Sequence, residues 1–477
     1  MITLNTYRDN YHDAKGTFKD FFQTSIRILP ITSNPASCSF DDSCGFDGVA
    51  GRFFRNLYEN KIDPIDDIKD QVIKPLHDFL TQDKGMSEGE ADRFIKIALN
   101  IVCPSDKLSV IDASFIKYLP YAKDARNKKS KSSDKYVSGQ KKLADFLSSA
   151  NTYTTITDST DKKDLFTNII KAAFEHGIPT KKTDDIEEYY IFPFLKKQFS
   201  ADFEWIMGRP DSVIVKYIDL LLNFYSCYIF TQTLIHISPK YKAEDYFRPL
   251  PLYFILATEK ASMKSEVITK GWEHYLPAEV IGKTFSRLQA WDILNCLTGV
   301  KSCCYTDVIS ALNDLGSFES NRETLMDLLR EFHDDKWAMF DNRPTSKNPN
   351  MPREVDYQAN SYEEFITLLF SLCEGLQEYT YDLRMRKRVY DLMMTRFLSL
   401  RRGKRLLNLD NEMLIFLIAM MTREKKTRLD NVYKKFSEYG IFFNMTTRKN
   451  IEQYLLKLNL LDRKSDSGEA QYVTVVL

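Results

Sequence analysis

The spacing of apolar residues over the last seventy positions predicts three consecutive amphipathic helices. Leu414, Leu417, Ile418 and Met421 occupy positions i, i+3, i+4 and i+7, which share one face of a helix. The same spacing recurs in two later sets: Leu429, Val432, Tyr433 and Phe436, and then Ile451, Tyr454, Leu455 and Leu458. Residues 471–476 alternate in character after a turn that contains Gly468, which predicts a β-hairpin. Three helices followed by a hairpin are typical of a winged helix-turn-helix.

Helical spacing also dominates the chain upstream of this segment. Apolar stripes predict helices around residues 165–177 and 325–332, and three prolines within 341–353 interrupt the pattern. Ser361 and Glu364 have the spacing of a capping box, which predicts a helical region that breaks near Gly375 and ends near Arg402. We therefore predict a mainly α, multi-domain helical protein with a C-terminal winged helix-turn-helix-like module.

The composition changes along the chain divide it into five expected parts. Residues 122–142 are rich in Lys and Ser and cannot bury much apolar surface, which predicts a loop or linker over 122–150. The five parts are a mixed, mostly helical N-terminal domain (1–121), the linker (122–150), a helical body (151–383), a basic helix (384–405) and the winged-helix-like module (406–477).

One apolar stretch, residues 213–237, is long enough to raise the question of a membrane span. It contains Lys216, Asp219 and His236, which are costly in lipid, so we expect a buried helix of a soluble protein. The chain opens without the basic and apolar pattern of a secretory signal, and its eight cysteines are scattered. Reduced thiols in a cytoplasmic protein without a membrane partner are the expectation.

Charge is distributed unevenly, although the whole chain has 66 Lys and Arg against 66 Asp and Glu. Residues 384–477 hold 20 of these basic residues and 10 of the acidic ones, which leaves 46 against 56 for residues 1–383. A basic segment of this kind favours contact with a polyanion such as double-stranded DNA. Docking of two oppositely charged parts of the chain on each other would produce the same asymmetry.

The candidate DNA-binding residues lie in three places. The third predicted helix would be the recognition helix, which presents side chains near its amino terminus to the major groove, and the hairpin would contact phosphate. The basic helix upstream would add sequence-independent affinity by neutralising phosphates. The candidates are Arg386, Lys387, Arg388, Arg401, Arg402, Lys404, Arg405, Arg448, Lys449, Gln453, Lys457, Arg463 and Lys464. A winged-helix module that contacts protein, with a solvated charged face, is the competing interpretation.

No pattern of catalytic or metal-binding residues emerges. Gly282-Lys283-Thr284 resembles the end of a phosphate-binding loop, but Pro277 occupies the position of the first glycine. Cys303 and Cys304 have no second pair at zinc spacing, and the six histidines form no His-x-x-x-His pair. Acidic pairs at 66–67, 184–185 and 187–188 are common on any acidic surface. We expect a protein that is not an enzyme and has no cofactor.

Several stretches of the sequence resemble one known family. Residues 459–473 (NLLDRKSDSGEAQYV), 440–443 (GIFF), 28–30 (ILP) and 48–54 (GVAGRFF) are similar to the DptG (DndG) family, a component of the bacterial DNA phosphorothioation-dependent restriction system. The resemblance implies a non-catalytic accessory subunit of an anti-phage complex that acts on DNA without the modification. It also implies DptF-like and DptH-like partners, to which ATP hydrolysis is attributed.

Two other functions remain open at this point. The chain could be a stand-alone winged-helix transcription regulator, which would bind one operator far more tightly than random DNA. It could also be a nuclease with an unrecognised carboxylate and metal site, whose nicking of DNA would depend on an acidic pair.

Overall fold

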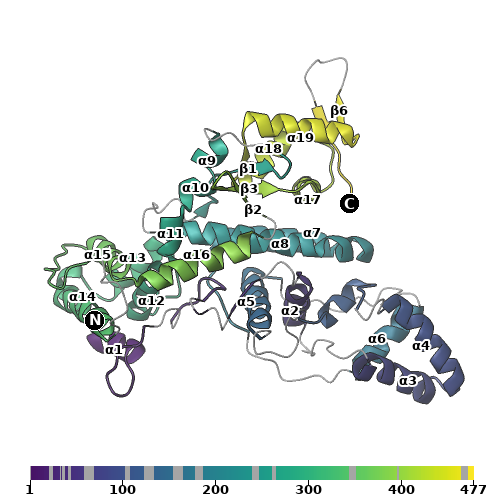
Figure 1. Cartoon of the computed structure of the whole chain (residues 1–477), viewed down its shortest axis with the longest axis horizontal. Coiled ribbons are helices and arrows are strands. Elements are labelled where there is room, and N and C mark those ends of the chain that lie inside the picture. Colours follow the sequence, from purple (N-terminus) through teal and green to yellow (C-terminus); the bar gives the residue numbers. More distant parts are fainter. Residues whose placement is uncertain are drawn as a thin grey trace.

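The computed structural model is mainly helical, as the sequence predicts. It describes the whole chain except residues 1, 21–24, 33, 35–37, 41–44, 59–68, 103–107, 123–133, 154–164, 178–185, 239–246, 260–264, 343–350, 395–396 and 464–470. Most of the described chain is arranged around one long central helix, α8 (Asp211–His236), as Figure 1 shows.

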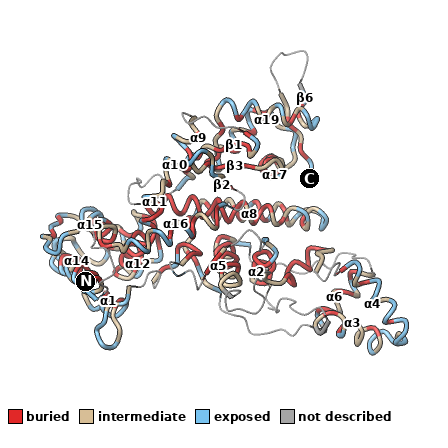
Figure 2. Tube along the Cα trace, in the orientation of Figure 1, coloured by how far each residue is buried: buried red, intermediate tan, exposed pale blue. Residues whose placement is uncertain are grey.

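Helix α8 is the core of the molecule. Every residue from Phe224 to His236 is buried, and α7 (Pro193–Met207) packs along it. A helix that is apolar all round has to be enclosed, and Figure 2 shows α8 as one of the most buried elements. By length and composition α8 is the one described helix that could span a membrane, and 67% of its most apolar window is buried inside the fold. It therefore has the burial predicted for residues 213–237.

A bundle of helices built from the start and the middle of the chain packs at the carboxyl-terminal end of α8, where the Trp291 indole N–H donates to the Ile237 carbonyl at 2.9 Å. It contains α1 (Leu4–Tyr11), α12 (Thr284–Thr298), α13 (Tyr305–Asp314), α14 (Phe318–Asp341) and α15 (Tyr362–Gly375). The capping box at Ser361 is half confirmed: its hydroxyl accepts from the Glu364 N–H at 3.2 Å, but the Glu364 carboxylate accepts from the Asn360 N–H instead.

The predicted linker is wrong over its second half, where residues form a core helix. Helix α5 (Asp134–Ala150) packs on α2 (Asp47–Leu57), and Leu143, Phe146 and Leu147 are buried on one face. The composition misled because the lysines at 141 and 142 lie on the less buried side of the same helix. Residues 123–133 lie outside the described residues.

Short helices build a satellite core beside this pair, at the lower right of Figure 1. They are η2 (Lys69–Ile73), α3 (Lys74–Asp78), η3 (Phe79–Asp83), α4 (Glu88–Val102), η5 (Ala113–Tyr118) and α6 (Leu165–Gly177). Phe115 and Phe174 meet edge to face there with ring centroids 5.2 Å apart. Helix α6 covers the stripe predicted around residues 165–177, and residues 178–185 lie outside the described part of the chain.

A four-stranded sheet, which the sequence did not predict, lies beside α8. Its order is β2 (Leu398–Arg401), β3 (Lys404–Leu409), β1 (Leu252–Leu256) and β5 (Ile441–Phe443), and β1 pairs in parallel with both β3 and β5. Short helices α9 (Glu266–Thr269), α10 (Trp272–Tyr275) and α11 (Ala278–Gly282) follow β1.

This sheet corrects the prediction of a basic helix over 384–405. Helix α16 (Tyr379–Met393) ends at Met393, and β2 and β3 form an antiparallel hairpin from Leu398 onward. Arg402 and Gly403 occupy its turn with φ of 50° and 77°, a left-handed conformation that favours glycine at the second position.

The predicted three helices and hairpin of the C-terminal segment are confirmed as elements. They are α17 (Asn411–Thr422), α18 (Leu429–Glu438) and α19 (Met445–Lys457), followed by β6 (Leu461–Arg463) and β7 (Gln471–Val473). A short strand β4 (Thr427–Arg428) between the first two helices completes an antiparallel sheet of order β4-β7-β6. Helix α17 is less amphipathic than expected, because Phe416, Ala419 and Met420 outside the predicted stripe are buried too.

Asp202 on α7 connects this C-terminal segment to the body. Its fully buried carboxylate accepts hydrogen bonds from Tyr225 on α8 (2.5 Å), Tyr439 before β5 (2.7 Å) and Arg423 at the end of α17 (2.7 Å). Burial raises the pKa of Asp202, while the charge of Arg423 opposes that increase. The C-terminal helices are therefore fixed to α7 and α8 by a buried polar cluster, and not only by apolar contact.

Candidate nucleic-acid interface

Helix α19 presents the clearest exposed basic face in the described part of the chain. Its amino terminus is capped by Asn444, whose side chain accepts from the Thr447 N–H at 2.8 Å. Thr447, Ile451 and Leu455 are buried toward the body. The opposite side carries four exposed candidates: Arg448, Lys449, Gln453 and Lys457. Three of them, at positions 449, 453 and 457, are spaced by four residues and therefore line one stripe of the helix.

The two lysines on this face have no ion-pair partner among the described residues. Neither Lys449 nor Lys457 forms an ion pair or side-chain hydrogen bond with another residue that the structure describes. Glu452, the acid on the same helix, accepts a hydrogen bond from Gln471 on β7 at 2.7 Å. A cation whose head group is held by water alone can exchange that hydration for a phosphate oxygen at low cost.

Arg448 is oriented by a tyrosine that the sequence analysis did not single out. Its guanidinium lies 4.7 Å from the ring centroid of Tyr433, and the Tyr433 hydroxyl donates to the Arg448 carbonyl at 3.2 Å. Burial raises the pKa of Tyr433 while Arg448 lowers it, so the phenol stays protonated and can donate. Cation–π contact holds the guanidinium at the surface without removing its charge. Positions 433 and 448 have no regular spacing in the sequence, so this contact could not be predicted from the sequence.

The basic residues of α16 are engaged within the fold. Arg386 forms two hydrogen bonds to Asp382, at 2.8 and 2.6 Å, and Lys387 pairs with Asp391 at 3.1 Å. Arg388 is buried and donates to the Ser39 hydroxyl at 2.8 Å. These three candidates therefore have contacts within the fold that stabilise the helix and its packing.

The hairpin between β2 and β3 uses its basic side chains in a similar way. Arg401 donates to the carbonyls of Ala257 and Glu259, and the Arg405 guanidinium lies 3.6 Å from the ring centroid of Tyr390. Lys404 pairs with Glu273 at 3.4 Å. Arg402, at the turn, is exposed and has no ion pair within the described residues.

Glu259, which follows β1, connects this hairpin to the amino-terminal turn of α19. Glu259, whose carbonyl receives Arg401, also accepts a hydrogen bond on its buried carboxylate from the Thr447 hydroxyl at 3.1 Å. This connection reaches the buried side of α19, opposite its exposed candidates, so it does not join Arg402 to the basic face of the helix. Of the remaining candidates, Arg463 lies on β6 with a side chain that is not described, and Lys464 lies outside the described residues.

The residues considered for catalysis are occupied by packing contacts. Lys283 pairs with Glu374 at 2.7 Å, and Thr284 donates to the Ile281 carbonyl at the junction of α11 and α12. Burial raises the pKa of Cys303 well above its ordinary value. The acidic pairs at 66–67 and 184–185 lie outside the described residues.

Glu187, in the third acidic pair, belongs to an internal ion cluster. Burial alone would raise the pKa of Glu187, but hydrogen bonds from Lys142, Tyr189 and Arg27 outweigh it and lower the pKa to about 2. This carboxylate is ionised at neutral pH and connects α5 to the segment before α7.

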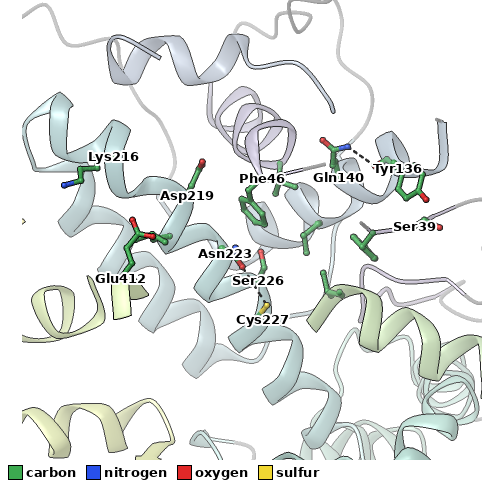
Figure 3. A pocket seen from close by; sticks show the side chains of 16 residues that line it. Ser39, Phe46, Tyr136, Gln140, Lys216, Asp219, Asn223, Ser226, Cys227 and Glu412 are labelled. Carbon is green, nitrogen blue, oxygen red and sulfur yellow. Dashed lines mark hydrogen bonds between the residues drawn. The ribbon is translucent and has the colours of Figure 1, made fainter. Parts of the chain in front are cut away.

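A cavity of about 470 Å³ lies between α8 and the α2–α5 pair, away from α19. Figure 3 shows Phe46 facing Asn223 and Ser226 of α8 across it, with Lys216 and Glu412 at one end. Two of its polar side chains form hydrogen bonds within the fold: Ser226 donates to the Leu222 carbonyl at 2.8 Å, and Gln140 donates to the Ala122 carbonyl at 2.9 Å. We assign no ligand to this cavity.

The sequence matches no known family model, and no curated protein matches it either.

Proposed function

We propose that this chain is a non-catalytic, DNA-contacting subunit that uses the exposed face of α19 to engage duplex DNA. The observation that carries the proposal is the stripe of Lys449, Gln453 and Lys457, with Arg448 beside it, in which neither lysine has an ion-pair partner among the described residues. Exposed cations release phosphate counterions on binding, and glutamine on such a helix can contact base edges.

The connectivity around α19 supports the use of this helix as a recognition helix. A strand between the first two helices pairs with the last strand, and the last two strands pair with each other, as in a winged helix-turn-helix. In that arrangement the third helix enters the major groove. The chain departs from a free-standing module at β5, which lies between α18 and α19 and joins the parallel sheet of the body.

This attachment favours an anchoring subunit over a transcription regulator whose DNA-binding domain moves independently of the body. The buried carboxylate of Asp202 and the β1–β5 pairing fix α19 relative to the large helical body. We propose that the body docks on DptF-like and DptH-like subunits of a phosphorothioation-dependent restriction complex, in line with the resemblance of residues 459–473 to the DptG family. The proposed complex acts in the cytoplasm on DNA that lacks the modification.

The salt dependence of duplex binding tests the DNA contact. Changing Arg448, Lys449 and Lys457 to Ala should flatten the slope of log affinity against log salt by about two to three units, since each lost phosphate contact removes about 0.9. The matched control changes one Arg and two Lys that are exposed elsewhere: Arg93, Lys96 and Lys301. An unchanged slope in the α19 variant would mean that this face contacts protein.

Affinity capture from the native host tests the complex separately. Tagged full-length chain should recover DptF-like and DptH-like subunits with and without nuclease treatment. Recovery of neither, from cells that express them, would contradict the proposed assembly while leaving the DNA contact standing.

A further inference from the structure

Three metal-ligand side chains converge where the end of α1 meets α14, far from α19 (Figure 1). His12 directly follows α1, and Glu331 and Asp335 lie four residues apart on α14, which places both carboxylates on one helix face. One ligand atom from each of the three lies within 4.8 Å of the others. His12 and Asp335 are 323 positions apart in the sequence, so no spacing rule applied to the sequence could find the cluster.

The cluster is reachable from solvent. An open cavity of about 490 Å³ is lined by His12 and Glu331 together with Arg8, Asp9 and Asp13. Its lining holds three carboxylates against one guanidinium, so the local charge favours a cation. Asp335 lies outside this lining, with a side chain that is 19% exposed, so the cavity leads to the cluster through His12 and Glu331.

The protein contacts of His12 leave its ring incompletely satisfied. Its Nε2 lies 3.0 Å from Asp335 Oδ2, which also accepts from the Tyr7 hydroxyl at 2.8 Å. The other ring nitrogen, Nδ1, is buried and has no hydrogen-bond partner within the described residues. Nε2 is the ring nitrogen that faces the carboxylates, so it is the candidate metal ligand, and Nδ1 then keeps the ring proton.

We propose that His12, Glu331 and Asp335 bind a divalent transition-metal ion such as Zn²⁺. One imidazole and two carboxylates are ligands that zinc accepts, with a fourth position left for water. The donors around a tetrahedral zinc lie about 3.3 Å apart for bonds of about 2.0–2.1 Å. The His12–Asp335 separation already has nearly this value, and the ion replaces their direct hydrogen bond.

Glu331 is the ligand that has to change partners. In the structure it accepts two hydrogen bonds from Arg8, at 2.7 and 2.8 Å, and the Arg8 side chain is 53% exposed. An exposed pair of this kind is weak, so the metal can displace Arg8 into solvent. Arg8 therefore acts as a competitor of the ion for Glu331.

Isothermal titration of the chelator-treated full chain with zinc sulfate tests the site. The wild type should bind one ion that His12→Ala or Asp335→Asn weakens at least about tenfold, because each removes one of three ligands. Asp327→Asn is the matched control, because Asp327 lies one helical turn before Glu331 on α14, is half exposed and pairs with Arg330. Equal binding by wild type, His12→Ala and Asp335→Asn would overturn the proposal, as would no binding by the wild type.

Arg8→Ala gives a result that misfolding cannot imitate. Removing the competing guanidinium should tighten zinc binding about two- to fivefold, which corresponds to the strength of an exposed ion pair. Unchanged or weaker binding in Arg8→Ala, with a wild-type circular dichroism spectrum, would contradict the assignment of Glu331 as a ligand.

Discussion

Loss of Arg423 should destabilise the chain by about 3 kcal/mol at neutral pH, because it leaves the Asp202 carboxylate buried without a cation. Breaking a buried ion pair by removing one partner costs about 3–5 kcal/mol. Arg423 is 34% exposed while Asp202 is fully buried, so the lower end of that range applies. The hydroxyls of Tyr225 and Tyr439 remain as donors to the carboxylate.

The same variant should be less impaired at low pH. Without Arg423, burial raises the folded-state pKa of Asp202 further above its unfolded value of about 3.9. The folded state then binds the proton more tightly, so stability is lost as the pH rises from about 4 through the folded-state pKa. The deficit of Arg423→Ala relative to wild type should therefore be larger at pH 8 than at pH 5.

Urea unfolding followed by tryptophan fluorescence measures both effects, since the Arg423 guanidinium lies 5.3 Å from the Trp205 ring centroid. Asp202→Asn provides the second side of a double-mutant cycle, and the double variant should be less destabilised than the sum of the single ones by about 2 kcal/mol. Additive single effects, or a cost of Arg423→Ala below about 1 kcal/mol at pH 7, would refute the role given to this pair.

Three further predictions concern the body and the sheet. Glu187→Gln should lower the free energy of unfolding by about 1 kcal/mol at pH 7, after allowance for solvent screening. Because the pKa of Glu187 is lowered in the folded state, this difference should shrink as the pH falls from about 4.5 toward 2, and thermal unfolding at several pH values would measure it. Gly440→Ala should lower the melting temperature more than Gly403→Ala: both have positive φ, but at Gly440 a new Cβ would lie 2.5 Å from a backbone oxygen, whereas at Gly403 it would meet nothing within 4 Å. Arg405→Ala should lower the melting temperature by removing the contact with Tyr390 and leave the salt slope of DNA binding unchanged; a flattened slope would mean that this side chain contacts phosphate.

Regular apolar spacing made the helices predictable, while the sheet depended on pairings that no local pattern contains. The stripes at 429–436 and 451–458 and the cap at Ser361 are local signals, and the structure has a helix at each. Strands β1, β3 and β5 are three to six residues long and pair across large sequence separations. Short apolar runs of this kind are compatible with a strand or with a buried helix.

The hairpin at 398–409 did carry a signal that the charge pattern obscured. Leu398 and Leu400 alternate with polar residues before Arg402 and Gly403, a two-residue connection that favours a hairpin turn. The density of arginines suggested one basic helix instead. Their partners, such as Glu273 for Lys404 and the Ala257 carbonyl for Arg401, lie more than a hundred residues away, so only the fold distinguishes structural cations from exposed ones.

Placement of α19 in the major groove can be measured directly with a photo-crosslinking residue at position 453. The residue should crosslink to duplex DNA, with the attachment mapping to base positions within one groove, because Gln453 lies at the centre of the exposed stripe. A crosslinker at Arg330, an exposed position on α14, is the matched control and should give no DNA adduct. Crosslinking to protein partners but not to DNA from position 453, under conditions where the chain binds duplex, would contradict DNA contact through α19.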